Sequence, residues 1–471
     1  MKKGEKTPNA AALLKTHFNV IQTSIKAPSL AYGMTFGNKK IAVHNSTLQF
    51  RIASMSKSFT AAAILLLRDR NKLQLDQPVG DIVPELKNLP LPTSDSPKVT
   101  IRHLLTMSSG LATDDPWGDR HLDADHEFMQ QLFADGGYFA NPPGTDFCYS
   151  NYGYAILGRV ISNASSQSFQ EFISQEILAP IGMHSTGWTP AAHHATPHRR
   201  RADAAIDDGM PPLADGGFAS MGGIWSNVDD LLLWANFMLN AFPARDGRDE
   251  GPLCRASRRE MQQISRAMQQ SSMPNLTQLK IFGGYGMGLR IFDSAVLGYL
   301  VSHSGGLPGY GSNMIWHPER QYALISLANV TYAPMFDANI LALQSLQHEG
   351  VLPAPRVRPT GNLQKHAEAL VAWLNTFDEE RGGKIFADNV ALDETFKRRQ
   401  QAFDCFSSNR GPYKCGEIVA QNAACADVVM LDRDGNPTLK LSFKLSPQVP
   451  PLIQWYEVNE IAPAEKEVVS V

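Results

Sequence analysis

The pattern of apolar and polar residues over the first 70 positions predicts a helix, a strand pair and a second helix. Residues 9–25 carry apolar side chains at helical spacing on one face. Segments 29–36 and 39–46 have the composition of strands, and Gly37 and Asn38 between them predict a tight turn. Residues 51–70, RIASMSKSFTAAAILLLRDR, again repeat apolar side chains at helical spacing. We expect this second helix to be mostly buried, because it is apolar on nearly every side.

The pattern changes along the middle of the chain. From about 75 to 275, short helical patterns alternate with loops rich in Pro, Gly, Ser and Asp, and no long strand-like alternation interrupts them. We therefore expect a largely helical insertion there. From residue 284, short segments rich in β-branched and aromatic residues are separated by Gly, Pro and polar turns. These segments predict three or four antiparallel strands, followed by a helix near 335–348.

A proline-rich segment divides the chain. The sequence VLPAPRVRPT at 351–360 predicts a stiff linker between a domain at 1–350 and a second domain at 361–471. The second domain shows two helical stretches and then strands, so we expect a small α+β domain. It faintly resembles cystatin-like or NTF2-like folds. Trp455 and Tyr456 favour packing or homo-oligomer contacts through this domain, with a ligand site or a cover for the active site as alternatives.

Composition and charge narrow the class of ligand. The 471 residues include 43 Lys plus Arg and 46 Asp plus Glu, for a formal charge of -3. This balance gives no electrostatic reason to expect nucleic acid or an anionic membrane surface as the partner. Hydrophobic residues make up 43% of the chain and charged residues 19%, as in globular proteins. We expect small-molecule ligands.

The sequence gives no sign of a membrane span, a leader or a metal site. The longest apolar runs, 61–67 and 231–234, are too short for a bilayer, and the N-terminus lacks an apolar core of signal-peptide length. We expect a cytoplasmic protein, or a periplasmic one if a leader has been removed. Five cysteines without a C-x-x-C pair indicate neither a disulfide framework nor a zinc site. The histidine-rich segment 193–201 lacks carboxylates, so we expect a loop and no metal or cofactor.

Ser54 and Lys57 form the first candidate chemical pair. An i to i+3 spacing places both side chains on one face of a helix, at its N-terminus. A surface lysine is the simple alternative, but the run AAAILLL that follows indicates a buried helix. A buried lysine whose pKa is lowered by desolvation can accept a proton from a serine hydroxyl.

Three short motifs in order carry a family resemblance. They are SMSK at 54–57, YSN at 149–151 and HSG at 303–305. With flanking stretches, the region from about 10 to 350 resembles the serine β-lactamase and penicillin-binding-protein superfamily. It is most similar to the branch of class C β-lactamases, D-Ala-D-Ala carboxypeptidases, D-aminopeptidases and esterases. The resemblance implies an α/β (α+β) fold, with an antiparallel sheet flanked by helices and an adjacent all-helical domain.

The resemblance also implies roles for the first two motifs. Ser54 would be the nucleophile that forms an acyl-enzyme, and Lys57 its base or the group that tunes that base. Tyr149 would pass the proton to the leaving group and activate the deacylating water. Asn151 would orient Lys57 and the acyl carbonyl.

The third motif would form one wall of the active site. We expect His303 to point into the cleft and Ser304 away from it, and Gly305 to let the substrate approach. The backbone N–H groups of Ser54 and Gly306 would form the oxyanion hole. A histidine in place of the lysine of class C β-lactamases is a weaker carboxylate anchor at neutral pH, so dedicated β-lactam hydrolysis is disfavoured.

Together these features predict a metal-independent serine hydrolase acting on a small amide, peptide or ester, such as a D-amino-acid peptide or a short-chain ester. A β-lactamase or penicillin-binding D-Ala-D-Ala carboxypeptidase is the alternative enzyme. A covalent binder or sensor that does not turn over is the alternative outside catalysis.

Overall fold

The chain folds into two compact units, Met1–Pro355 and Arg356–Val471. The computed structural model describes residues 9–199, 201, 206, 209, 211–249, 251–268, 281–353, 361–407 and 410–461. Most of the expected linker, residues 354–360, lies outside these described residues. The first unit has two hydrophobic cores and the second unit has its own.

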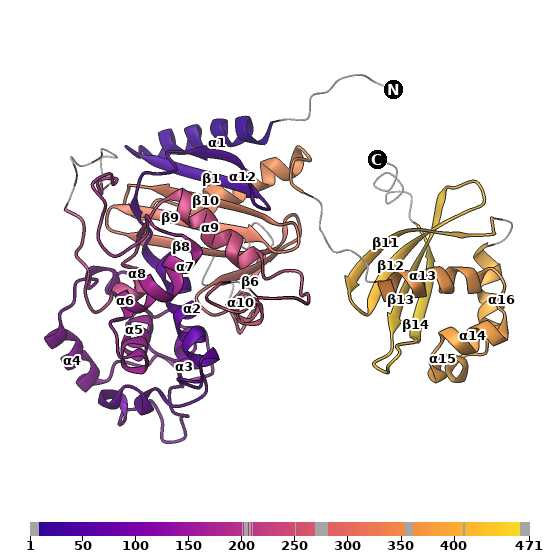
Figure 1. Cartoon of the computed structure of the whole chain (residues 1–471), viewed down its shortest axis with the longest axis horizontal. Helices are drawn as coiled ribbons and strands as arrows, with labels where there is room; N and C mark the ends of the chain where they lie inside the picture. Colours follow the sequence, from indigo (N-terminus) through magenta and orange to yellow (C-terminus); the bar gives the residue numbers. More distant parts are fainter. Residues whose placement is uncertain are drawn as a thin grey trace. The chain divides into compact units, whose positions relative to one another are not determined.

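An antiparallel sheet of eight strands forms the centre of the first unit, in the order β2-β1-β10-β9-β8-β7-β6-β5 (Figure 1). The strands are β1 Leu30–Phe36, β2 Lys39–His44, β5 Arg266–Ala267, β6 Ile281–Tyr285, β7 Arg290–Ser294, β8 Gly298–Leu307, β9 Tyr310–His317 and β10 Tyr322–Ala328. The N-terminal hairpin β1–β2 joins the sheet beside its last strand, β10. Five strands, β6–β10, therefore stand where three or four were expected, because most of β6 (IFGGY) precedes residue 284 and its two central glycines have low strand propensity.

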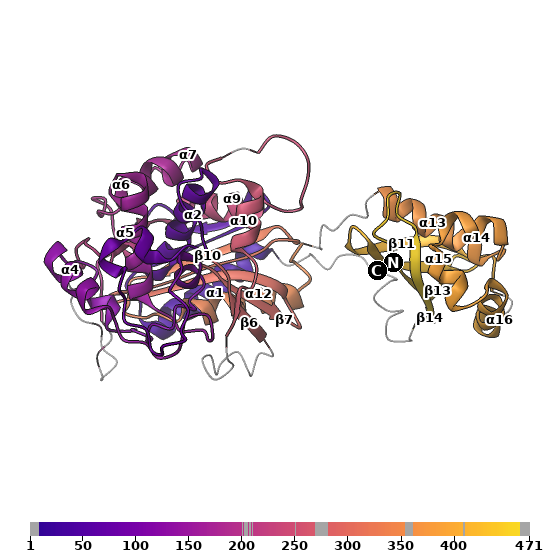
Figure 2. The same cartoon turned by 90° about the horizontal axis from the view of Figure 1, so that it is seen from below.

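Helices cover both faces of this sheet (Figure 2). Helices α1 (Ala10–Ile25) and α12 (Met335–His348) pack on one face and enclose one core. Helix α9 (Val228–Leu239) packs against β1, β9 and β10 on the other face. Every residue of β10 is buried, as expected for a central strand with both faces covered.

A layer of shorter helices lies beside the sheet, around α2 (Ser56–Asp69) and α5 (Asn151–Ser165). The others are α3 Ile101–Leu105, α4 His126–Asp135, α6 Phe169–Ile173, α7 Ala179–Ile181, α8 Ala219–Gly222 and α10 Arg255–Met261. Helix α5 packs against α2, α3 and α8, and the larger core runs through this layer into the sheet.

The expected helical insertion at 75–275 ends earlier than its apolar pattern indicated. Strand β4 (Trp225–Ser226) pairs with β3 (Phe50–Arg51), and β5 joins the edge of the large sheet. Helix α9 belongs to the sheet layer, because its buried face covers the strands. Strands β4 and β5 have two residues each, which is too short to leave a pattern in the sequence.

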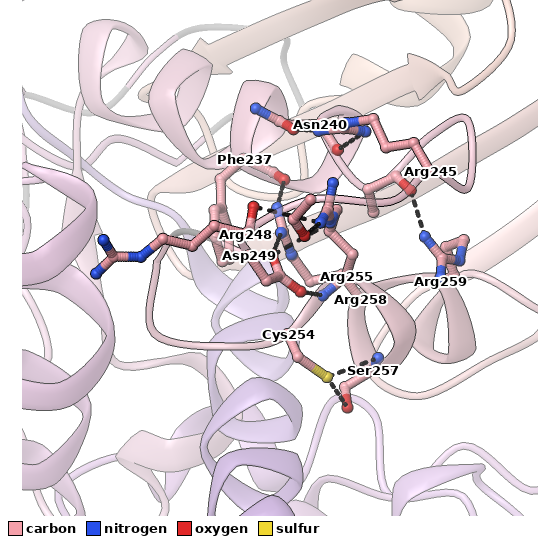
Figure 3. A network of polar contacts seen from close by, with 12 residues as sticks. Phe237, Asn240, Arg245, Arg248, Asp249, Cys254, Arg255, Ser257, Arg258 and Arg259 are labelled. Atoms are coloured by element: carbon pink, nitrogen blue, oxygen red, sulfur yellow. Dashed lines mark hydrogen bonds and ion pairs between the residues drawn. The ribbon is translucent and has the colours of Figure 1, made fainter.

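A buried arginine fixes α10 next to α9 (Figure 3). The Arg258 side chain is 2% exposed, and it donates hydrogen bonds to the Phe237 carbonyl at 2.5 Å and to the Asp249 carboxylate at 3.0 Å. Asp249 also accepts a hydrogen bond from the Arg255 backbone N–H. A guanidinium withdrawn from water needs such partners, so this contact holds the loop after α9 in place.

Over the described residues 361–407 and 410–461, the second unit has four helices followed by four consecutive antiparallel strands. They are α13 Gly361–Leu374, α14 Glu379–Ile385, α15 Asp388–Asp393, α16 Phe396–Ser407, β11 Lys414–Asn422, β12 Cys425–Leu431, β13 Pro437–Leu445 and β14 Ile453–Glu460. Trp373 lies at the centre of its core, in ring contact with Phe386 and Tyr456. Two helical stretches were expected here, and the short polar α14 and α15 were missed. The fold class of both units is as predicted.

Among the residues described, no helix combines the length and the apolar character that a bilayer crossing requires.

Candidate active site

Ser54 lies in a sharp turn that joins β3 to α2. The turn is one 3₁₀ segment, Ala53–Met55, and the Ser54 side chain is largely buried. Ala53 has φ +52°, in the left-handed region that residues with a Cβ rarely adopt. Such a backbone persists only when its surroundings hold it, and it sets Ser54 at the head of the buried helix α2.

Lys57 follows one turn later, and its side chain is completely buried. Its Nζ donates hydrogen bonds to Ser54 Oγ at 2.9 Å, to Asn151 Oδ1 at 2.7 Å and to the Met221 carbonyl at 2.9 Å. The alternative of a surface lysine is therefore wrong. The three acceptors fix the amine within reach of the serine hydroxyl.

The surroundings of Lys57 change its proton affinity. Burial lowers the pKa of Lys57 to about 8, while the carboxylates of Asp115, Asp119 and Asp114 partly oppose this effect. Arg290 adds to the lowering. An amine with a pKa near 8 is partly neutral at physiological pH, so it can take a proton from Ser54.

Asn151 begins helix α5, and its side-chain orientation follows from its partners. Its Nδ2 donates to Asp115 Oδ1, so its Oδ1 faces the Lys57 amine. Asp114 accepts hydrogen bonds at 2.7 Å from the backbone N–H groups of Asn151 and Tyr152, at the start of the helix. Asp115 therefore orients the side-chain amide that contacts Lys57, and Asp114 anchors the backbone of the same residue.

Tyr149 also lies close to Lys57, whose Nζ is 4.9 Å from the centre of the phenol ring. Burial, together with the Asp115 carboxylate and Tyr285, raises the pKa of Tyr149 well above its usual value. Arg290 and a hydrogen bond with Ser54 oppose this rise without reversing it. Tyr149 is therefore a protonated phenol at neutral pH, and it can donate a hydrogen bond or a proton.

The third motif differs from the expectation at two residues, because Ser304 lines the cavity and His303 is buried. His303 on β8 is 1% exposed, its Nδ1 donates to the Ser304 carbonyl at 2.6 Å, and its Nε2 accepts from the Tyr285 hydroxyl at 3.1 Å. Burial, helped by Arg290 and Lys57, lowers the pKa of His303 well below its usual value. Ser304 instead lines the cavity described below. His303 still faces the catalytic residues, because its ring centre lies 6.4 Å from that of Tyr149, but it is covered and does not line the cavity.

The two glycines of β8 allow two different close approaches. A Cβ on Gly305 would lie 2.1 Å from the Ile52 carbonyl oxygen, so this glycine makes room for the turn that carries Ser54. It was expected to make room for substrate. A Cβ on Gly306 would lie 2.6 Å from the Tyr332 ring. Both glycines also line the cavity.

A cavity of about 400 Å³ opens at Ser54, a size suited to a small ligand. It is lined by Ser54, Asp115, Pro116, Asp119, Tyr149, Arg290, Ser304, Gly305, Gly306, Tyr332 and Ala333. The structure thus brings Ser54, Tyr149 and the glycines of β8 to one space, with Lys57 and Asn151 behind Ser54.

Four further residues that the sequence did not point to line the same cavity, namely Asp115, Asp119, Arg290 and Tyr332. No short spacing links them to the three motifs, because they come from separate loops and from the start of β7. The pair Asp114-Asp115 before a proline was the one local sign of a polar loop. Within the described residues, no group of three or more His, Cys, Asp or Glu side chains is arranged to hold a metal ion.

Comparison with known proteins shows which family the chain matches. The family model described as Beta-lactamase matches residues 19–347, more than half of the chain. The chain belongs to this family. It is 28% identical over 337 residues to penicillin-binding protein 4* of Bacillus subtilis, covering 67% of this chain and 69% of that protein. It is 26% identical over 327 residues to Protein flp of Staphylococcus aureus, covering 64% of this chain and 57% of Protein flp.

Two solved structures share the fold. A penicillin-binding protein from Bacillus halodurans matches with a TM-score of 0.54 and 23% identity, over 69% of this chain and 100% of that one. An octameric penicillin-binding protein homologue from Pyrococcus abyssi matches with a TM-score of 0.56 and 19% identity, over 96% of both chains. These likenesses confirm the β-lactamase-like fold.

Proposed function

We propose that this member of the beta-lactamase family is a serine hydrolase that forms an acyl-enzyme on Ser54 and hydrolyses a small amide, peptide or ester. One observation carries the proposal: a buried Lys57 amine, with its pKa lowered to about 8, lies 2.9 Å from the Ser54 hydroxyl. A lysine in this state has no evident structural purpose, because burying an amine costs free energy.

In the first half of the reaction, Ser54 Oγ attacks the carbonyl carbon as its proton moves to the neutral Lys57 Nζ. The Asn151 and Met221 oxygens already accept from Nζ, so they stabilise the ammonium that results. The backbone N–H groups of Ser54 and Gly306 would hold the oxyanion. Tyr149 then gives its phenol proton to the leaving group and recovers a proton from Lys57.

In the second half, water attacks the Ser54 ester, its proton passes to the Lys57 amine, and Ser54 Oγ takes a proton back from Lys57 as the acid leaves. The high pKa of Tyr149 means that the phenol is protonated at rest and acts first as a donor. The Lys57 amine is again the nearest group able to accept the proton of the water, directly or through Tyr149. The rate of this step decides whether the protein is a turnover enzyme or a lasting covalent binder.

The test combines mass spectrometry with ester hydrolysis. Wild-type protein, Ser54→Ala and the control Ser58→Ala are incubated with a penicillin, and hydrolysis of a short-chain nitrophenyl ester is followed in the same samples. Ser58 lies on the same helix and donates to the Met55 carbonyl, so it controls for the loss of a buried hydroxyl. Turnover that needs Ser54 but tolerates Ser58→Ala supports the proposal. If the wild type is not labelled by the penicillin and turns over neither substrate, the proposal is contradicted.

The same samples separate the alternatives. Ester turnover without a lasting penicillin adduct favours an esterase or aminopeptidase. Rapid penicillin hydrolysis favours a β-lactamase, and a stable adduct at Ser54 favours a penicillin-binding carboxypeptidase or a sensor. The similarity to penicillin-binding protein 4* is the reason to include a penicillin among the probes.

We also propose that the chain forms homo-oligomers through its second unit. The octameric homologue from Pyrococcus abyssi matches over 96% of this chain, which supports an assembly of similar chains. The second unit exposes several apolar side chains, namely Leu392, Val419, Val449 and Trp455. Light scattering of wild type and of Leu392→Ser with Trp455→Ser tests this proposal. A wild-type monomer at all concentrations would contradict it.

A further inference from the structure

Asp119 is a buried carboxylate in the wall of the active-site cavity, outside the Ser54, Lys57 and Asn151 contacts. Its side chain is 3% exposed and its Oδ2 accepts a hydrogen bond of 2.8 Å from the Tyr332 hydroxyl. Its Oδ1 is buried without a hydrogen-bond partner among the described residues. A buried carboxylate oxygen without a donor is costly, so this atom calls for a ligand that donates.

A second carboxylate faces the same cavity. Asp115 lines it together with Asp119, against the single guanidinium of Arg290 among the charged groups in its wall. Lys57 behind Ser54 must be neutral when it accepts the serine proton, so it then contributes no positive charge. At that step the cavity wall carries one negative charge more than positive charges, which favours a cationic ligand.

We propose that Asp119, with Asp115, binds a protonated primary amino group in the acyl part of the substrate. The substrate class is therefore an amino-acid amide, peptide or ester with a free amine; this rests on the proposed function. Asp115 is bonded to Asn151, which we place beside the acyl carbonyl, so the two carboxylates flank the acyl side. An ammonium offers three donors, enough for Asp119 Oδ1 and a second carboxylate oxygen.

The proton affinity of Asp119 agrees with this role. Burial, together with the neighbouring Asp115 carboxylate, raises the pKa of Asp119 to about 7. A cation beside the carboxylate would lower that pKa again, because an opposite charge favours the ionised form. The hydroxyl of Tyr332 keeps Oδ2 in place and leaves Oδ1 for the ligand.

The kinetic test uses two substrates that differ only in the amine, alanine methyl ester as either enantiomer and methyl propionate, at pH 8. The kcat/KM ratio of the amino ester to methyl propionate is measured for wild type and for Asp119→Asn. Asparagine keeps the size of the side chain and an oxygen for Tyr332, but it removes the charge. We expect the ratio to fall about tenfold or more, chiefly through KM for the amino ester.

The control is Asp95→Asn, which removes the same charge from an exposed loop position of the first unit. Since the two esters differ in intrinsic reactivity, the change in the ratio between variants is the decisive value. A ratio that is equal in wild type and Asp119→Asn overturns the inference. If hydrolysis of methyl propionate in the same experiment depends on Ser54, the proposed function stands even when this inference fails.

A binding measurement does not depend on turnover. Calorimetry on the Ser54→Ala protein compares D-alaninamide with propionamide, and then repeats the comparison with Asp119→Asn added. We expect D-alaninamide to bind at least tenfold more tightly than propionamide, and the difference to vanish in the double variant. Equal affinity for the two amides in Ser54→Ala overturns the inference, whether or not the wild type hydrolyses esters.

Discussion

Ser312 on β9 donates a hydrogen bond of 2.8 Å to the carbonyl oxygen of Ile52, two residues before Ser54. The bond passes beside Gly305, where a Cβ would lie 2.1 Å from the Ile52 oxygen and 2.3 Å from Ser312 Oγ. The sheet thus binds the turn that carries Ser54, and this contact requires a glycine at position 305.

We expect Gly305→Ala to reduce both activity and stability. The added methyl meets a backbone oxygen, which cannot rotate away, so either the turn or β8 must move. Overpacking of this kind costs about 1–3 kcal/mol, and a shift of the turn would separate Ser54 from Lys57. Thermal unfolding and kcat for a short-chain ester measure the two effects. Gly187→Ala is the control, because a Cβ there has no atom within 4 Å; equal effects in the two variants would contradict this explanation.

The activity of the wild type should rise with pH as Lys57 loses its proton. Only the neutral amine accepts the proton of Ser54, and the pKa of Lys57 is about 8, so kcat/KM for a neutral ester should level off above pH 8. Asp115→Asn removes the largest charge that raises this pKa, and the inflection should then move to lower pH. A profile that is flat from pH 6 to 9, or an inflection that Asp115→Asn leaves in place, would count against Lys57 as the base.

His303 should remain neutral across the physiological range. Its burial and the charges of Arg290 and Lys57 hold its pKa well below the usual value, so its imidazole resonances should not shift between pH 6 and 8. Comparison of spectra from wild type and His303→Asn assigns the resonance. In urea the same histidine should titrate near pH 6.5, about the value of a model peptide. A native titration near 6.5 would restore the histidine as a charged anchor.

A carboxylate on the substrate should depend on Arg290 rather than on His303. Arg290 lines the cavity, while His303 is buried beside Tyr285. We expect Arg290→Gln to raise KM for a carboxylate-bearing ester about tenfold relative to its neutral counterpart. His303→Asn should not change that ratio. If His303→Asn changes the ratio and Arg290→Gln does not, the assignment is reversed.

Loss of the Asp249 charge should destabilise the first unit. Arg258 is almost fully buried and Asp249 is its ionic partner at 3.0 Å, so Asp249→Asn leaves a buried guanidinium poorly compensated. Because Asp249 itself is 30% exposed, we expect a loss of about 1–3 kcal/mol rather than the larger cost of a fully buried pair. Calorimetry should show a lower Tm. The control Asp246→Asn lies in the same loop at an exposed position and should leave Tm within error.

The sequence predicted what depends on local pattern and on ordered motifs. The helix at 10–25, the first hairpin and the helix of Lys57 follow from periodicity. Residues of all three motifs, Ser54, Tyr149 and Ser304, line one cavity. The burial of His303 and the exposure of Ser304 to the cavity were not predicted, because they depend on how neighbouring segments pack around β8. Asp119 and Tyr332 were missed because 213 residues separate the partners of their hydrogen bond. Contacts of that kind arise from tertiary packing, which periodicity does not record.

The larger core of the first unit runs without a break from the sheet into the layer of α2 and α5. Ser54 and Lys57 come from one side of that packing, Asn151 from a second helix and Gly305 from a strand. The geometry of the reaction centre therefore depends on how the sheet and the helical layer pack against each other. Catalysis is impaired by displacements of the reacting groups that are far smaller than those that unfold a domain. A substitution deep in this core should accordingly slow turnover by more than its loss of stability alone would explain.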